Sequence, residues 1–448
     1  IANPSIAMVQ TPQTYATADH VSLQVDPERR QVVLPRPAGV IFALTPSTNP
    51  VATAYFNILL ALLTRNTIVV SPHPFAKSVT AKAARIMAEA AVAAGAPDGC
   101  IQVVAEPSVP LVNALMTDER VDVIVATGGT PMVRAAYSSA NPALGVGPGN
   151  VPVLVDETAD LARAARLIVD SKCFDNSVLC TNESVLVAVD SIADRLLTEL
   201  QRAGSYIATP EESARLADLI FDGERLNTTW IGRDAAAIAE AAGITVPRGT
   251  RILITPIDLV VPEERLAHEK LMPVLALVRV PTVDRGIAAA QAVLRITGAG
   301  HSAAVHSQDA TTIAKYAAAV RVLRVAANVG SSLGNSGFET HLAPTMTIGT
   351  GFFGRSSLGA NLAPEHLVHE TRIAYPVDLG VPMPDFAQQQ PWSAPAGPVP
   401  AYPNASNLDP APATARGEVF PAGMGETDAL REEIRRLVIE ELRAMVKN

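Results

Sequence analysis

Short apolar segments alternate with helical patterns between residues 38 and 140, and this alternation constrains the fold more than any other feature. Four segments have the composition of buried strands: 38–45 (AGVIFALT), 66–71 (NTIVVS), 101–105 (IQVVA) and 121–127 (VDVIVAT). Helical patterns lie between them, at 51–64, 75–94 and 130–140. Strands that are apolar throughout and separated by helices indicate a parallel sheet with both faces covered. The sequence therefore predicts a doubly wound α/β domain, an architecture that commonly binds cofactors.

A second series of the same kind follows the glycine-rich segment GVGPGN (145–150). Its strand patterns lie at 151–155, 184–189, 275–280, 302–307 and 321–329. We therefore expect two doubly wound α/β domains with parallel sheets. Ahead of the first series, alternating residues in VSLQV (21–25) and RQVVLPRP (30–37) predict a hairpin arm.

The composition bounds the partners and the compartment. A net charge of −9 provides no basic field for nucleic acid. No apolar run approaches the roughly eighteen residues that a membrane span needs, and the start of the chain is not a secretory signal. The cysteines, Cys100, Cys173 and Cys180, are too few for a disulfide framework and favour a reducing, cytoplasmic location. Since the sequence does not start with Met, we expect it to begin within a longer protein.

Cys180 lies in the polar segment FDNSVLCTNES (174–184), between a predicted helix and a predicted strand. A reactive thiol needs thiolate character and solvent access, and such a loop supplies access. The alternative is a small buried hydrophobic residue, the commoner state of a free cysteine. Cys173, at the end of a helix, and Cys100, in a turn before a strand, fit that structural role better. No second cysteine or histidine lies close by in this segment, so no metal site is expected.

The loops after the predicted strands carry candidate nucleotide contacts. TPSTNP (45–50) follows the first strand in place of a G-x-G-x-x-G loop. In ATGGTPM (126–132), two glycines precede a helix, so that backbone N–H groups could face a phosphate, although Gly-Gly turns are common. SPHP (71–74) ends the second strand, where an adenosine ribose would be recognised, or is only a proline-stiffened turn.

Seven motifs, taken in order, make the chain similar to the CoA-acylating aldehyde dehydrogenases over residues 36–380. They are TPSTNP, SPHPFAK, VATGGTPMVRAAYSS, GVGPGNVPVLVDETAD, SKCFDNSVLCTNES, HEKLMPVLALVRV and LAPTMTIGTGFFG. The resemblance is strongest to the propionaldehyde and acetaldehyde enzymes of bacterial microcompartments. The acylating succinate-semialdehyde and sulfoacetaldehyde enzymes, and the aldehyde half of bifunctional alcohol–aldehyde dehydrogenases, are also similar. The resemblance implies oxidation of a short-chain aldehyde to acyl-CoA, with NAD or NADP as cofactor and coenzyme A as co-substrate.

The same resemblance implies roles for individual residues. Cys180 falls on the catalytic cysteine, and its backbone N–H would be one donor to the oxyanion. Asn49 or Thr48 would be the second donor. Glu269 matches the glutamate that contacts the nicotinamide ribose, the alternative being a surface carboxylate. The other implied cofactor contacts are Thr45, Pro46, Ser47, His73, Thr127, Gly128 and Gly129.

One departure separates the chain from hydrolytic aldehyde dehydrogenases, which carry a Glu-Leu-Gly-Gly motif whose glutamate activates water. The equivalent segment here is GVGPGN, and Gly145 falls on the position of that glutamate. Without this base, water is a poor acceptor of a thioester, whereas the CoA thiol needs less activation. We therefore expect Cys180 to carry the acyl group and pass it to CoA in a ping-pong scheme.

These inferences divide the chain into six segments: 1–37 with the hairpin arm, 38–150 as the cofactor domain, 151–355 as the catalytic domain, 356–384 as the return segment of an oligomerisation arm, 385–426 as a disordered proline-rich linker and 427–448 as an amphipathic helix. A homodimer or homotetramer is expected. The helix carries balanced charge, which gives no attraction to an anionic membrane.

The helix at 427–448 resembles the encapsulation peptides of microcompartment cargo enzymes, which bind shell proteins, and so implies a location inside a microcompartment. The alternative is a helix that packs on its own enzyme or self-associates. Two other functions stay open for the whole chain. One is a hydrolytic dehydrogenase that makes a free acid, which Gly145 disfavours. The other is an inactive scaffold that binds shell proteins, which the retention of Cys180 and the cofactor loops disfavours.

Overall fold

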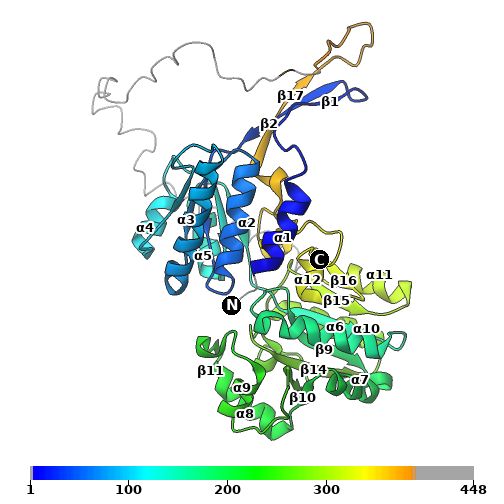
Figure 1. Ribbon diagram of the computed structural model, residues 1–448. Helices are drawn as coiled ribbons and strands as arrows, with labels where there is room; N and C mark the ends of the chain where they lie inside the picture. The colour runs from blue at the N-terminus through cyan, green and yellow to red at the C-terminus, as the bar shows by residue number, and fades with distance from the viewer. Residues whose placement is uncertain (1–3, 387–388, 390–448) are drawn as a thin grey trace, which may run out of the picture. The chain divides into compact units, whose positions relative to one another are not determined.

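The computed structural model describes residues 4–386 and residue 389, and its first parallel sheet lies between residues 40 and 146 (Figure 1). Its strand order is β5-β4-β3-β6-β7. The strands are β3 (Val40–Leu44), β4 (Thr67–Ser71), β5 (Ile101–Val103), β6 (Val123–Thr127) and β7 (Ala143–Val146). All their pairings are parallel, so the carboxyl ends of the strands lie along one edge.

Helices cover both faces of this sheet because its central strand is apolar on both sides. Ile41 and Ala43 pack with α2 (Pro50–Leu63) and α3 (Lys77–Ala93). Phe42 and Leu44 face the opposite way and pack with α4 (Val109–Met116) and α5 (Thr130–Tyr137). Successive strand residues point to opposite faces, so an uninterrupted apolar strand requires helices on both sides.

The second parallel sheet begins at Val151 and has the order β10-β13-β14-β9-β8-β15-β16. Its strands are β8 (Val151–Val155), β9 (Glu183–Val189), β10 (Ser205–Ile207), β13 (Ile252–Pro256), β14 (Val274–Val280), β15 (Ala303–His306) and β16 (Val325–Ala327). Helices flank it, among them α6 (Leu161–Cys173), α7 (Asp190–Arg202), α8 (Pro210–Ile220), α10 (Val283–Ile296) and α11 (Ala310–Ala319). One continuous hydrophobic cluster surrounds its strands, and both sheets belong to one compact unit, Ile1–Gln389.

A three-stranded antiparallel arm extends from the first sheet in Figure 1. β1 (Gln24–Asp26) and β2 (Gln31–Pro37) form the hairpin that the sequence predicts. β17 (Val368–Ala374) adds a third strand on the other side of β2, from within the predicted return segment 356–384. β17 is therefore an edge strand, and six of its seven residues are exposed.

The predicted doubly wound α/β fold is confirmed by the two parallel sheets. Some elements differ from the predictions. β7, which ends with Gly145 and Val146, was not predicted as a strand, and the predicted strand 321–329 is only three residues long. α1 (Pro4–Tyr15) and α4 have no counterpart in the predictions. The predicted helix 427–448 and nearly all of the predicted linker 385–426 lie outside the described residues.

Candidate active site

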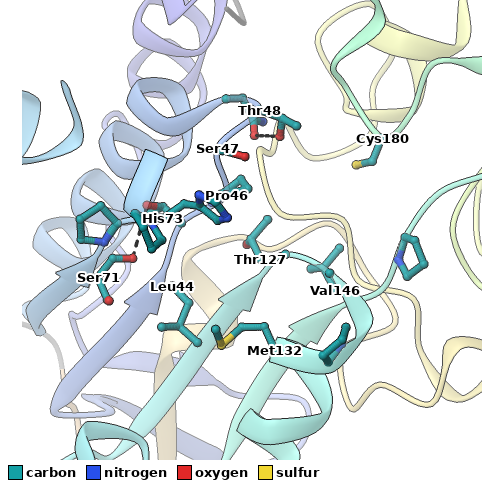
Figure 2. Close-up of a pocket in the computed structure, with 18 of the residues that line it drawn as sticks. Leu44, Pro46, Ser47, Thr48, Ser71, His73, Thr127, Met132, Val146 and Cys180 are labelled. Atoms are coloured by element: carbon teal, nitrogen blue, oxygen red, sulfur yellow. Dashed lines mark hydrogen bonds between the residues drawn. The ribbon is translucent and has the colours of Figure 1, made fainter. Parts of the chain in front are cut away.

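A cavity of about 600 Å³ opens where the carboxyl ends of β3, β4 and β6 meet the loop that carries Cys180 (Figure 2). All eleven site residues predicted from the sequence line it: Thr45, Pro46, Ser47, Thr48, Asn49, His73, Thr127, Gly128, Gly129, Cys180 and Glu269. They come from five loops spread over more than two hundred residues of sequence. Ligands in open α/β sheets bind at the carboxyl ends of the strands, where nine of the eleven lie.

The loop after β3 supplies short polar groups, and Asn49 is the N-cap residue of α2. Asparagine usually caps a helix through its side chain, but among the described residues its side chain makes no capping hydrogen bond. Instead, the Thr48 hydroxyl donates to Asn49 Oδ1 at 3.1 Å. This bond turns the amide so that its oxygen faces Thr48 and its N–H₂ is left to act as a donor. Of the two predicted candidates, Asn49 therefore has the amide donor free of the bond to Thr48, while the Thr48 hydroxyl is engaged with the amide oxygen.

The loops after β4 and β6 complete the cofactor side of the cavity. His73 Nδ1 accepts the backbone N–H of Phe75 at 3.3 Å, and burial lowers the pKa of the imidazole. The ring is therefore neutral near pH 7 and can contribute hydrogen bonds rather than charge. Gly129 is the N-cap residue of α5. A Cβ on Gly128 would meet no protein atom within 4 Å, so the space beside this backbone is open to a ligand.

Cys180 follows a 3₁₀ turn, Phe174–Ser177, that continues from α6. Its side chain is half-buried, and Figure 2 shows the sulfur pointing towards the loop of Ser47 and Thr48. Burial, and secondarily the negative charge of Glu269, raise the pKa of the thiol to about 12, while Arg324 opposes this shift. Burial therefore favours the protonated thiol over the thiolate.

Glu269 lies next to the nucleophile and is half-buried rather than on the surface. Its carboxylate accepts the backbone N–H of Gly149, and burial raises its pKa to about 8. Gly149 separates the two groups: a Cβ there would lie 2.0 Å from the Cys180 carbonyl oxygen and 3.3 Å from Glu269 Oε1. Only glycine allows this close approach of the two backbones.

Three further ionisable side chains are fully buried beneath this side of the cavity. Lys172 Nζ donates to Asn182 Oδ1 at 2.6 Å, and burial lowers its pKa to about 7 against the opposing charge of Glu183. Glu183 accepts hydrogen bonds from the Ser171 hydroxyl and the backbone of Ser331, both at 2.7 Å. Lys270 Nζ donates to four oxygens: Leu266 O, His268 O, Ser184 O and Ser184 Oγ. Buried charges at such density typically mark functional sites.

The position of the missing water-activating glutamate needs correction. Gly145 lies on the face of β7 that packs against α5, where a Cβ would come within 2.6 Å of the Tyr137 ring and 2.7 Å of Val133. Val146, the next residue, lines the cavity. Because side chains alternate along a strand, an acidic residue at 145 would face α5, and 146 is the position that faces the site. The motif resemblance placed the departure one residue earlier, because aligned letters do not show which way a side chain faces.

Apolar residues that the sequence did not single out line the cavity together with Cys180: Val178, Ile231, Leu271 and Met346. They are spread over residues 178–346, so no local pattern could have grouped them. Among the described residues, Glu269 is the one carboxylate that lines the cavity. No cluster of three or more potential metal ligands occurs in the part of the chain that the structure describes. Nor is any described helix long and apolar enough to cross a membrane.

Comparison with known proteins gives consistent matches. The profile of the aldehyde dehydrogenase family matches residues 5–339. The bifunctional aldehyde-alcohol dehydrogenase of Escherichia coli (strain K12) is 40% identical over 348 residues, which are 77% of this chain but 39% of that protein. The chain therefore spans about two fifths of the length of this relative.

Two solved structures are similar over most of both chains. An acetylating aldehyde dehydrogenase from Geobacillus thermoglucosidasius is 37% identical with a TM-score of 0.81, covering 85% of this chain and 84% of that one. A propionaldehyde dehydrogenase from the fucose utilisation bacterial microcompartment of Clostridium phytofermentans is 29% identical with a TM-score of 0.74, covering 83% and 87%.

Proposed function

Since this chain belongs to the aldehyde dehydrogenase family, we propose that it oxidises a short-chain aldehyde to acyl-CoA, with NAD or NADP as hydride acceptor and Cys180 as acyl carrier. The observation that carries this proposal is that the Cys180 thiol lines the same cavity as the loops after β3, β4 and β6. In that cavity, Val146 stands where a hydrolytic enzyme would need a base. The similarity to an acetylating aldehyde dehydrogenase supports it.

The residues present fit a nicotinamide dinucleotide. The backbone beside Gly128 and Gly129, ahead of α5, offers N–H groups and open space to a phosphate. Ser47, His73 and Thr127 can form neutral hydrogen bonds with ribose hydroxyls, and Glu269 can do so next to Cys180. When bound, the nicotinamide ring would accept a hydride from the aldehyde carbon to which the Cys180 sulfur has added.

In the first half of the reaction, the Cys180 thiol releases its proton to solvent, the resulting thiolate adds to the aldehyde carbon, and the carbonyl electrons move to oxygen. The oxyanion accepts hydrogen bonds from the Cys180 backbone N–H and the Asn49 amide, and each such donor stabilises the transition state by about 3 kcal/mol. Loss of the hydride leaves an acyl thioester on Cys180. In the second half, the CoA thiolate attacks the thioester carbonyl, and Cys180 departs as a thiolate.

The acceptor is CoA rather than water because Val146 cannot take a proton from water. Its apolar side chain stands at the cavity wall, and the remaining carboxylate, Glu269, is held by the Gly149 N–H. An external thiol at neutral pH is already partly ionised and needs no base as strong as water requires.

The deciding experiment is a panel of short aldehydes assayed with NAD and with NADP, in the presence and absence of CoA. We expect reduced cofactor and acyl-CoA only when CoA is present. Equal turnover without CoA, with free acid as product, would support the hydrolytic function instead. No reduced cofactor with any aldehyde would support an inactive scaffold.

A pair of variants tests the role of the position facing the cavity. Val146→Glu should raise CoA-independent release of free acid, because it places a base beside the thioester. Gly145→Glu should not, since its side chain would be directed at Tyr137. Acid release by the second variant alone would restore the original assignment of Gly145.

We also propose that the protein assembles as a homodimer or homotetramer through its arm and is cargo of a bacterial microcompartment. β17 is an exposed edge strand, which proteins normally cover or pair. The amphipathic pattern of 427–448 and the similarity to a microcompartment enzyme support shell binding. Deletion of 427–448 should leave turnover intact and abolish co-purification with shell proteins, whereas loss of turnover would mean that this segment belongs to the enzyme. Light scattering should give a mass of two or four chains.

A further inference from the structure

The turn that leads into Cys180 has an unusual backbone. Asp175, Asn176 and Ser177 have φ angles of 47°, 51° and 69°, so that three successive residues other than glycine are left-handed. This conformation is unfavourable for residues with a Cβ and rarely continues beyond one residue. It persists only where surrounding contacts determine it, and such strain is typical of functional sites.

One buried side chain, Asn182, holds the end of this turn. Its Oδ1 accepts from the Ser177 hydroxyl at 2.7 Å, and its Nδ2 donates to the carbonyl oxygens of Ser177, at 2.8 Å, and of Leu179. Asn182 is 4% exposed. Its amide therefore spans residues 177 to 179 and adds side-chain hydrogen bonds to the few backbone bonds of the turn, such as Val178 N–H to Asp175 O at 3.4 Å.

Lys172 determines which way this amide faces. Its Nζ donates to Asn182 Oδ1 at 2.6 Å, and the side chain is fully buried at the end of α6. Lys172 and the Ser177 hydroxyl both donate to the amide oxygen, so this oxygen faces Lys172 and the amide nitrogen faces the two carbonyls. Without Lys172, the amide would be held only by the Ser177 hydroxyl and the two carbonyl oxygens.

We propose that Lys172 and Asn182 are positioning residues that hold the strained turn and thereby aim the sulfur and the backbone N–H of Cys180 into the cavity. The expected effect on catalysis rests on the proposed function, whereas the restraint on the Cys180 backbone does not. Cys180 lies between Leu179, which Asn182 holds, and Thr181, whose hydroxyl donates to Ser332 O at 2.8 Å. Cys180 is therefore held through both neighbouring residues. Of the two restraints, only the one made by Asn182 acts on the strained left-handed turn.

The test uses the full chain with Asn182→Asp and Lys172→Met. Asn182→Asp keeps the volume and the acceptor but loses both N–H donors, so the turn should relax. We expect kcat to fall by about a hundredfold, as for a misplaced nucleophile, with little change in KM or in the dissociation constant for NAD. Lys172→Met keeps the donors and should show a smaller loss, about tenfold. The double variant should be no worse than Asn182→Asp, because both residues act through one amide.

Alkylation by iodoacetamide, followed at each cysteine by mass spectrometry, separates this role from a general loss of stability. A relaxed turn should expose Cys180 to water, so Cys180 should react faster and with a pKa nearer 9 while turnover falls. Cys100, which is buried, should stay unreactive and thereby report that the chain is folded. Unchanged Cys180 reactivity, or labelling of Cys100 at the same rate, would overturn the proposal.

Asn66→Asp is the matched control. Asn66 is 4% exposed, accepts from Gly39 N at 2.7 Å and donates to Thr64 Oγ1 and Leu367 O, away from the cavity. The Asn66→Asp variant should lower the midpoint of unfolding without changing kcat or the alkylation rate of Cys180. If the wild-type chain forms no acyl thioester, the proposed function fails, and the alkylation measurements still test the positioning role by themselves.

Discussion

The two sides of the cavity are built on opposite principles. The cofactor side consists of strand ends, with backbone N–H groups, hydroxyls and a neutral histidine. The thiol side rests on buried charges, Lys172, Glu183 and Lys270, and on a left-handed turn. Ligand binding can use groups that any parallel sheet presents at the carboxyl ends of its strands. Catalysis, in contrast, requires side chains in unfavourable states, here buried ionisable groups and a left-handed backbone. Variants should therefore act on affinity on the first side and on turnover on the second.

The largest effect should come from the thiol itself. Cys180→Ala removes the acyl carrier and should lower acyl-CoA formation by about a thousandfold or more. Cys173→Ala and Cys100→Ala should keep most of the activity, since neither side chain lines the cavity among the described residues. The measurement is acyl-CoA formation, together with mass spectrometry of the acyl adduct. Full activity of Cys180→Ala, or an acyl adduct on another residue, would mean that the thiol side of the cavity does not carry the acyl group.

The second largest effect should come from Asn49, the one cofactor-side residue to which we assign a role in the reaction. Asn49→Ala removes an oxyanion donor and should lower kcat by about 10² to 10³. Thr48→Val leaves the amide in place but removes its orienting bond, so about a tenfold loss is expected. The two values of kcat, measured at saturating aldehyde, decide the assignment. A larger loss for Thr48→Val would make the hydroxyl the donor.

A third prediction concerns the charge beside the thiol. The carboxylate of Glu269 raises the pKa of Cys180, so Glu269→Gln should lower that pKa and speed alkylation of Cys180. The difference should grow above pH 8, where the native carboxylate, with a pKa of about 8, is charged. The rate of alkylation as a function of pH measures it, with Glu263→Gln on the surface as control. Slower alkylation in Glu269→Gln would mean that the carboxylate accepts the thiol proton.

The smallest effect is on acid stability and should arise in the half of the chain that carries the thiol. Burial lowers the pKa of His301 from 6.5 to about 3 and that of His306 from 6.5 to about 4. Below pH 6.5 the unfolded chain binds protons that the folded chain excludes, so stability falls as pH decreases towards 4. Urea midpoints measured across this range should show the slope, and His306→Asn should reduce it. A slope unchanged in this variant would mean that His306 is protonated in the folded state.

Much of the candidate site was predictable because it follows strand ends. Apolar strand patterns place TPSTNP, SPHP and the Gly128–Gly129 turn at the carboxyl edge of one parallel sheet, and the order of seven motifs points to Cys180. The directions in which residues 145 and 146 face were not predictable from a glycine-rich segment to which no strand was assigned. It became clear only when β7 paired with β6 and alternation along the strand put Val146 at the cavity.

The sequence by itself determined two doubly wound sheets, a lone thiol in a polar loop and a family resemblance, because periodicity, composition and motif order are local properties of a chain. Only the tertiary structure decided that Glu269 lies beside Gly149 and Cys180, that Asn182 bonds to Lys172 and to a left-handed turn, and that the Thr48 hydroxyl bonds to the Asn49 amide oxygen. These relations join residues separated along the chain or depend on side-chain orientation. The packing of one sheet edge against the cysteine loop sets them, and no window of sequence contains that information.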